Sequence, residues 1–244
     1  MKIALAPQLE AVTPPLRVGG LVPLTTTDYP GQLAAVVFCQ GCPWQCGYCH
    51  NPHLIPSAEQ TDQPWENVRA FLQRRRGLLD ALVFSGGEPT LQPGLEAAIL
   101  EARDMGFRIG LHTAGTYPER LKNLLPLLDW VGMDIKAPFD LYQRITRVPG
   151  SGARALASAR HVLASGVACE FRTTVHPALL SHENLLSLAH ELAGMGVRNY
   201  VVQEFRADGC ADETLCAQTA RGFLFPELIE QISALFENFS VRKS

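Results

Sequence analysis

Residues 34–52 read Ala-Ala-Val-Val-Phe-Cys-Gln-Gly-Cys-Pro-Trp-Gln-Cys-Gly-Tyr-Cys-His-Asn-Pro, an apolar run that passes directly into a cysteine-rich loop. The β-branched and aromatic residues of Ala34–Phe38 predict a buried strand. A second unit of the same kind follows, in which apolar Leu82–Phe84 leads into the polar motif Ser85-Gly86-Gly87-Glu88-Pro89-Thr90. Functional loops at the carboxyl ends of buried strands are typical of parallel α/β folds. The stretch therefore predicts that fold class.

Further along the chain, strand-like runs alternate with stretches in which apolar residues recur at helical spacing. Leu185, Leu188, Ala189 and Leu192, for example, share one face of a predicted helix. This alternation favours parallel βαβ units, in a complete or partial (β/α) barrel or an open doubly wound sheet. The six predicted strands are Ala34–Phe38, Leu82–Phe84, Arg108–Leu111, Trp130–Met133, Glu170–Thr174 and Tyr200–Val202.

No linker or low-complexity stretch divides the chain, so we expect a single domain over residues 1–244. Residues 1–30 contain Pro14-Pro15 and Gly19-Gly20 and are predicted to be an irregular lead-in. The barrel core is expected over about residues 31–206. A loop and a final helix, around Pro226 to Phe236, are expected within about residues 207–244.

The composition excludes several classes of protein. The 244 residues carry 21 Lys and Arg against 24 Asp and Glu, and 47% are hydrophobic. Neither a disordered tail nor a strongly basic nucleic-acid binder has this balance. The longest apolar run, Leu33–Cys39, is far shorter than the roughly 20 residues that cross a bilayer. We therefore expect a soluble cytoplasmic protein that binds neither nucleic acid nor membrane.

The cysteine cluster has three interpretations. Zinc sites need two well-separated cysteine pairs, and only three residues separate Cys42 from Cys46. A four-cysteine electron-transfer cluster would need Cys39, which closes an apolar strand, and the spacing differs from that of ferredoxins. The third interpretation uses Cys42, Cys46 and Cys49 as ligands of a [4Fe–4S] cluster and leaves one iron open to a substrate or cofactor.

The spacing C-x3-C-x2-C, with Tyr48 before the last cysteine and Gly86-Gly87-Glu88-Pro89 further on, resembles the radical S-adenosylmethionine superfamily. More closely, Asp28-Tyr29-Pro30-Gly31 and Tyr48-Cys49-His50-Asn51-Pro52 resemble the activating proteins of anaerobic ribonucleoside-triphosphate reductase, which are relatives of the pyruvate formate-lyase activating enzyme. The resemblance covers about residues 19–206. It implies a partial (β/α)6 barrel, a [4Fe–4S] cluster and reductive cleavage of S-adenosylmethionine.

The resemblance also implies roles for individual residues. Cys42, Cys46 and Cys49 would hold the cluster, and no catalytic residue is expected beyond the cluster and S-adenosylmethionine. Asp134-Ile135-Lys136 resembles an Asp-Leu-Lys motif of such activases, in which the aspartate would hold the lysine or a bound monovalent cation. The residues expected to bind S-adenosylmethionine are Tyr48 (adenine), Gly86 and Gly87 (close backbone approach), Glu88 (methionine ammonium), Thr113 (ribose or carboxylate), Asp134, Lys136, Arg172 (carboxylate) and Arg206 (adenine).

Some of these residues also have plainer interpretations. Thr113 could cap a turn, Arg172 could form a structural ion pair, and Arg206 could be a solvated loop residue. In addition, His112 stands where pyruvate formate-lyase activating enzymes have aspartate, and Ala114 replaces their asparagine. A cation site built like theirs is therefore in question.

Three functional hypotheses follow. The first is an activase that abstracts a glycine hydrogen from anaerobic ribonucleoside-triphosphate reductase, with a flavodoxin- or ferredoxin-like electron donor. The second keeps the radical chemistry but acts on another glycyl-radical enzyme or on a small molecule. The third is a non-catalytic iron–sulfur protein for electron transfer or sensing.

Overall fold

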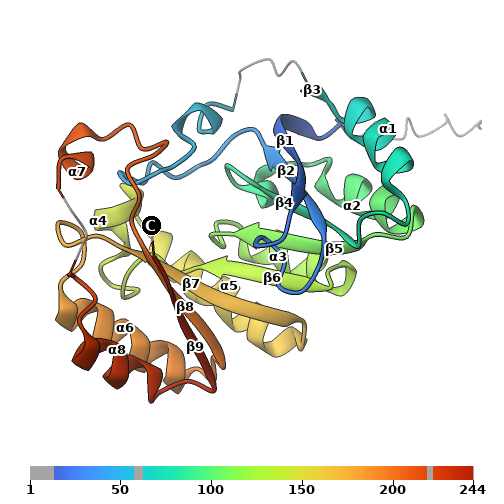
Figure 1. Cartoon of the computed structure of the whole chain (residues 1–244). Helices are drawn as coiled ribbons and strands as arrows, with labels where there is room; N and C mark the ends of the chain where they lie inside the picture. Colours follow the sequence, from blue (N-terminus) through green and yellow to red (C-terminus); the bar gives the residue numbers. More distant parts are fainter. Residues whose placement is uncertain (1–13, 58–62, 219–221, 244) are drawn as a thin grey trace, which may run out of the picture.

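The described strands form one mixed sheet, which stays open at its ends (Figure 1). The computed structural model describes residues 14–57, 63–218 and 222–243. Within these residues the strand order is β3-β1-β2-β4-β5-β6-β7-β8-β9, with β3 and β9 at the two edges. The strands are β1 (Arg17–Thr25), β2 (Ala34–Cys39), β3 (Gln63–Pro64), β4 (Ala81–Gly86), β5 (Arg108–Thr113), β6 (Trp130–Asp134), β7 (Ala168–Val175), β8 (Asn199–Glu204) and β9 (Asn238–Arg242).

The strands from β2 through β4 to β9 pair in parallel, whereas β1 runs antiparallel to both β2 and β3. Helices connect successive parallel strands, as the crossover geometry of βαβ units requires. They are α1 (Trp65–Arg75), α2 (Leu95–Asp104), α3 (Pro118–Leu124), α4 (Tyr142–Thr146), α5 (Ser151–Ser165), α6 (His182–Gly194), α7 (Glu213–Cys216) and α8 (Pro226–Ser233). Short 3-10 turns lie at Pro52–Leu54, Pro89–Leu91 and Leu125–Leu127.

The six strands predicted from the sequence are confirmed, because each lies within β2, β4, β5, β6, β7 or β8. They are consecutive neighbours in the sheet. An open sheet with six such units is the partial (β/α)6 barrel that was expected.

At the ends of the chain, one expectation is wrong and one strand was not predicted. The lead-in is not irregular throughout, because Arg17–Thr25 forms β1 and pairs with β2 through Val18 and Leu21. Gly19-Gly20 is a pattern typical of turns, so the sequence did not predict a strand here. In the structure, a Cβ at position 19 would collide with the side chain of Leu54. At the other end, the expected final helix is present as α8, and a strand that the sequence did not predict, β9, follows it and extends the sheet beyond β8. Residues 1–13 lie outside the described residues.

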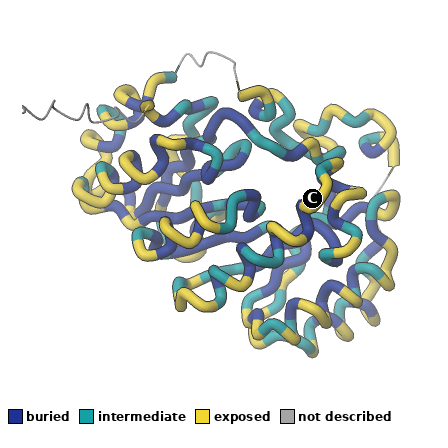
Figure 2. Tube along the Cα trace, turned by 180° about the vertical axis from the view of Figure 1, so that it is seen from behind, coloured by how far each residue is buried: buried dark blue, intermediate teal, exposed yellow. Residues whose placement is uncertain are grey.

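The sheet is buried on both faces. Alternate residues of each strand point to opposite faces, so one set packs against the helices and the other lines the concave side. On the concave side, Ala34, Val36, Ala81 and Val83 form a small cluster with Trp130 and Tyr29. The rings of Tyr29 and Trp130 stack with centroids 5.3 Å apart. Figure 2 shows the central strands mostly buried, while the helices alternate between buried and exposed residues, and β1 and β9 have only one buried residue between them.

Within the described residues, no helix has the length and apolar character that a membrane crossing requires.

Candidate cofactor site

The loops that follow β2 and β4 lie against each other through their backbones. Gly87 N donates to Cys39 O over 2.9 Å, and Glu88 N donates to Gly41 O over 2.9 Å. A Cβ on Gly87 would collide with the carbonyl of Gly41, so this contact requires glycine. The cysteine loop and the Gly-Gly-Glu motif are therefore held together by main-chain contacts at the carboxyl edge of the sheet.

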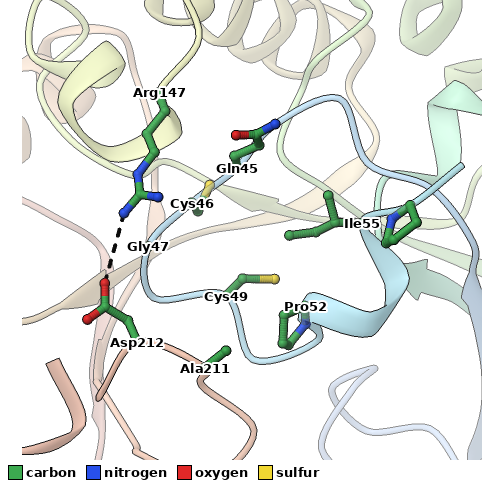
Figure 3. A pocket seen from close by; sticks show the side chains of 10 residues that line it. Gln45, Cys46, Gly47, Cys49, Pro52, Ile55, Arg147, Ala211 and Asp212 are labelled. Atoms are coloured by element: carbon green, nitrogen blue, oxygen red, sulfur yellow. Dashed lines mark ion pairs between the residues drawn. The ribbon is translucent and has the colours of Figure 1, made fainter. Parts of the chain in front are cut away.

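The cysteine loop borders a cavity of about 420 Å³ (Figure 3). Cys46 and Cys49 line this cavity, and Cys42 lies just before them, half-buried. The loop is fixed on both sides, because Gln45 N donates to Thr146 O over 3.0 Å and Gly41 N donates to Leu54 O over 2.7 Å. All three thiols are free, as metal ligands must be.

The three thiols lie on one short loop, between positions 42 and 49. No group of three His, Cys, Asp or Glu side chains in the described part of the chain is arranged to hold a metal ion. In a [4Fe–4S] cluster each cysteine binds a different iron, so the ligands of a cluster need not converge on one point.

Cys39 belongs to the core rather than to this site. Its side chain is fully buried at the end of β2, and burial raises the pKa of its thiol. It packs with apolar residues of the helix-facing side of the sheet. This position argues against the four-cysteine electron-transfer cluster, which would need Cys39 as a ligand.

In the cysteine loop, burial disfavours the charged thiolate form of the cysteines. Burial raises the pKa of Cys42 to about 12, and it also raises the pKa of Cys46. Lys136 opposes this effect at both cysteines. Thiolates in this loop therefore need positive charge nearby, which bound iron supplies directly.

Glu88 is the buried acid of the site. Its Oε1 accepts hydrogen bonds from Thr90 N (3.1 Å), Thr90 Oγ1 (2.6 Å) and Thr113 Oγ1 (2.8 Å). Its Oε2 accepts one hydrogen bond from the described residues, from Ala114 N over 2.9 Å. Burial raises the pKa of Glu88, and the hydrogen bonds from Thr90, Thr113 and Ala114 oppose that rise. Oε2 is thus the oxygen with capacity for a further donor.

Thr113 lies where the sequence places it, at the end of β5, but its hydroxyl is already engaged. It donates to Glu88 and accepts a hydrogen bond from Gly115 N over 3.0 Å. Thr113 therefore both caps a turn and orients the carboxylate of Glu88.

Lys136 and Tyr48 lie together beside the cysteine loop. Lys136 Nζ sits 5.4 Å from the centre of the Tyr48 ring, and both side chains are buried. Burial alone would lower the pKa of Lys136, but Tyr48, Cys46 and Asp134 hold it well above its usual value. The ammonium group therefore stays charged next to the cysteines, in position to meet an anionic ligand.

Asp134 pairs with Arg172 and not with Lys136. The two residues are partners in the parallel register of β6 and β7, and Arg172 Nε donates to Asp134 Oδ1 over 2.9 Å. The structural ion pair considered for Arg172 is therefore present. Arg206 is exposed in the loop after β8, where its carbonyl lies 3.0 Å from His50 Nε2.

Two charged residues of the cavity wall were not expected from the sequence. Arg147 and Asp212 face each other across the cysteine loop, with Arg147 Nη2 3.9 Å from Asp212 Oδ2 (Figure 3). Arg147 has a φ of 59°, and no other non-glycine residue among those described has a positive φ. Nothing in the sequence marks it, because a left-handed backbone is usually signalled by glycine or asparagine.

An open parallel α/β sheet with a three-cysteine loop and a buried Gly-Gly-Glu acid at its carboxyl edge defines an iron–sulfur enzyme of the partial-barrel class. The chain belongs to the Radical SAM superfamily, whose family profile matches residues 36–201. It is therefore an enzyme of the class that uses a [4Fe–4S] cluster and S-adenosylmethionine.

Two relatives are similar over most of their length. A Methanocaldococcus jannaschii protein, described as a proposed glycyl-radical enzyme activating enzyme, is 32% identical over 205 residues, which cover 80% of this chain and 82% of that protein. The pyruvate formate-lyase-activating enzyme of Clostridium pasteurianum is 32% identical over 182 residues, or 71% of this chain and 75% of that enzyme.

A solved structure shares the fold. Streptococcus suis SuiB bound to S-adenosylmethionine superposes with a TM-score of 0.59 at 13% identity, over 83% of this chain and 48% of that one. At this identity the match supports the partial-barrel architecture alone.

The described residues fit the two cofactors of the family. Three free thiols lie on one loop beside a cavity of about 420 Å³. A buried carboxylate with a free acceptor position, Glu88, and a buried ammonium, Lys136, lie at the same edge of the sheet. These groups match the ammonium and carboxylate of an amino acid such as the methionine moiety.

Proposed function

We propose that this chain activates a glycyl-radical enzyme, and that its target is anaerobic ribonucleoside-triphosphate reductase. The observation that carries the proposal is similarity to two activating enzymes over 82% and 75% of their lengths. The motif Tyr48-Cys49-His50-Asn51-Pro52, with Asp28-Tyr29-Pro30-Gly31, supports the finer choice of target.

In this function, the following residues of the site would have defined roles. Cys42, Cys46 and Cys49 would hold the cluster. Glu88 Oε2 would accept a hydrogen bond from the methionine ammonium, and Lys136 would face its carboxylate. Gly86 and Gly87 would let the backbone approach the ligand, and Tyr48 would lie beside the adenine.

When bound, the cluster and S-adenosylmethionine would supply the radical chemistry that removes a hydrogen atom from a glycine Cα of the partner. The protein contributes orientation and exclusion of water. Burial of Glu88, Lys136 and Tyr48 keeps their contacts in a low-dielectric environment, where charge-assisted hydrogen bonds are stronger.

The proposal is tested with the reconstituted, reduced protein. It is mixed anaerobically with S-adenosylmethionine and with anaerobic ribonucleoside-triphosphate reductase, and glycyl radical is measured by electron paramagnetic resonance. We expect a doublet with the reductase and formation of 5′-deoxyadenosine. A doublet with pyruvate formate-lyase alone would overturn the choice of target. A well-formed cluster that yields no 5′-deoxyadenosine would overturn the activity itself. A flavodoxin and a ferredoxin can be compared as electron donors in the same assay.

A further inference from the structure

Arg172 is a buried cation that is fixed on several sides. Its Nε donates to Asp134 Oδ1 over 2.9 Å, and its Nη2 donates to Gly132 O over 3.3 Å. Its Nη1 lies 3.2 Å from His112 Nε2. The side chain is 8% exposed, against 40% for its partner Asp134. The guanidinium therefore lies under a carboxylate that is itself open toward the carboxyl edge of the sheet.

Gly132 makes room for this guanidinium. A Cβ at Gly132 would lie 2.9 Å from both Cζ and Nη1 of Arg172, closer than real side chains approach. The strand β6 thus lacks a side chain at the point where Arg172, from β7, crosses its surface. The position is built into two neighbouring strands and does not depend on a loop.

His112 adds a neutral group on the same side. Its Nε2 lies 2.8 Å from Asp28 O, and its Nδ1 lies 3.3 Å from Ser85 Oγ. Burial and the nearby Arg172 lower the pKa of His112 to about 3, so the ring is uncharged at neutral pH. A neutral imidazole is a weak ligand for a hard monovalent cation, which prefers oxygen.

The charges around Asp134 disfavour the binding of a further cation. Asp134 supplies one negative charge, while Arg172 and Lys136 supply two positive ones, and these two cations lower the pKa of Asp134 against the desolvation that would raise it. The other buried carboxyl of the site, Glu88, accepts hydrogen bonds from Thr90, Thr113 and Ala114, and its remaining acceptor position on Oε2 is the one proposed for the methionine ammonium. The monovalent cation that the family resemblance suggested beside Asp134 does not fit these residues.

We propose that the Arg172 guanidinium, clamped by Asp134 over Gly132, is the permanent cation of this pocket, and that the chain binds S-adenosylmethionine without any monovalent metal ion. Arg172 then acts as a positioning residue, because it fixes Asp134 and adds positive charge beside Lys136. The inference concerns cofactor binding and is independent of which protein or molecule is activated.

The test measures binding of S-adenosylmethionine to the cluster-loaded protein by equilibrium dialysis, without any protein substrate. Potassium, sodium and tetramethylammonium chloride are compared at equal ionic strength. We expect dissociation constants that agree within about twofold in the three salts. Binding that is more than about tenfold tighter in potassium would overturn the proposal. Because no glycyl radical is measured, failure of the proposed function would leave this result unaffected.

In contrast to the wild type, the variant Arg172→Met is expected to depend on potassium. Arg172→Met keeps much of the side-chain volume but leaves Asp134 without its partner, so binding should weaken by about tenfold in tetramethylammonium and recover in potassium. Arg172→Lys keeps the charge and should remain insensitive to the salt. Wild-type affinity of Arg172→Met in every salt would overturn the role of the guanidinium. The wild-type comparison needs no variant, and it decides the cation question even where Arg172→Met fails to load the cluster.

A second readout avoids the cofactors. In the cluster-free full-length protein, potassium should not shift the thermal unfolding midpoint relative to tetramethylammonium. The same salt change should raise the midpoint of Arg172→Met, because a cation can then bind at Asp134. A potassium-specific rise in the wild-type midpoint would contradict the inference.

Discussion

Thr113 donates its hydroxyl proton to Oε1 of Glu88 over 2.8 Å, and both side chains are buried where β4 and β5 end. The loop after β4 therefore supplies the carboxylate of Glu88, and Thr113 of the neighbouring strand β5 holds that carboxylate in place. The contact matters because a buried carboxylate that loses a donor is left partly unsatisfied.

Thr113→Val should remove this hydrogen bond at nearly constant volume. We expect a loss of about 1–3 kcal/mol in the free energy of unfolding and weaker binding of S-adenosylmethionine. Thr113→Ser retains the hydroxyl and serves as the matched control. Denaturant unfolding and equilibrium dialysis measure the two effects. Equal affinities of the valine and serine variants would show that Thr113 does not position Glu88.

Replacement of single cysteines should separate cluster ligands from core residues. Cys42→Ala, Cys46→Ala and Cys49→Ala should each abolish binding of the [4Fe–4S] cluster, measured as iron and sulfide per chain after anaerobic reconstitution. Cys39→Ala should keep the cluster and lose about 1–2 kcal/mol of stability, because it leaves a small cavity in the core. Loss of iron in Cys39→Ala would instead revive the four-cysteine electron-transfer cluster.

Because of His112, the free energy of unfolding should fall in mild acid. Its pKa falls from the usual 6.5 to about 3 in the folded protein, so between these values the unfolded chain binds the proton more tightly. Stability from the neutral ring is complete above about pH 6.5 and declines toward pH 3, by up to about 1.4 kcal/mol per pH unit. His112→Gln should flatten this part of the profile. Urea unfolding of both proteins between these pH values gives the difference, and parallel profiles would contradict the prediction.

Arg147 should carry a backbone cost that glycine relieves. Because its φ is 59°, Arg147→Gly should be more stable than Arg147→Ala by about 1 kcal/mol. Both variants lose the exposed ion pair with Asp212, so that effect cancels in the comparison. Denaturant unfolding measures the difference. Stabilities in the reverse order would mean that the left-handed backbone is not strained.

Regular patterning made most of the sheet predictable. Ala34–Phe38 and Leu82–Phe84 are short apolar runs followed by polar loops, and buried parallel strands require that pattern. The sequence did not predict the strand β1, because its main-chain pairing with β2 does not depend on side-chain type and Gly19-Gly20 is typical of a turn. β9 follows the predicted final helix and pairs at the sheet edge, where fewer side chains are buried.

The candidate site was predictable where chemistry dictates residue type and spacing, and unpredictable where pairing depends on register. The cysteine spacing and Glu88 stand out in the sequence. The partnership of Asp134 with Arg172 depends on β6 and β7 being neighbours in one register, because the two residues are 38 positions apart in the sequence. Arg147 and Asp212 meet only because the loop after β8 folds back over the cysteine loop.

The main-chain bonds from Gly87 to Cys39 and from Glu88 to Gly41 have an evolutionary consequence. They tie the loop of the buried acid to the cysteine loop through main-chain groups, which every residue type carries. Mutations that reshape the rim for a new target can therefore accumulate while the distance on which the radical chemistry depends is inherited unchanged.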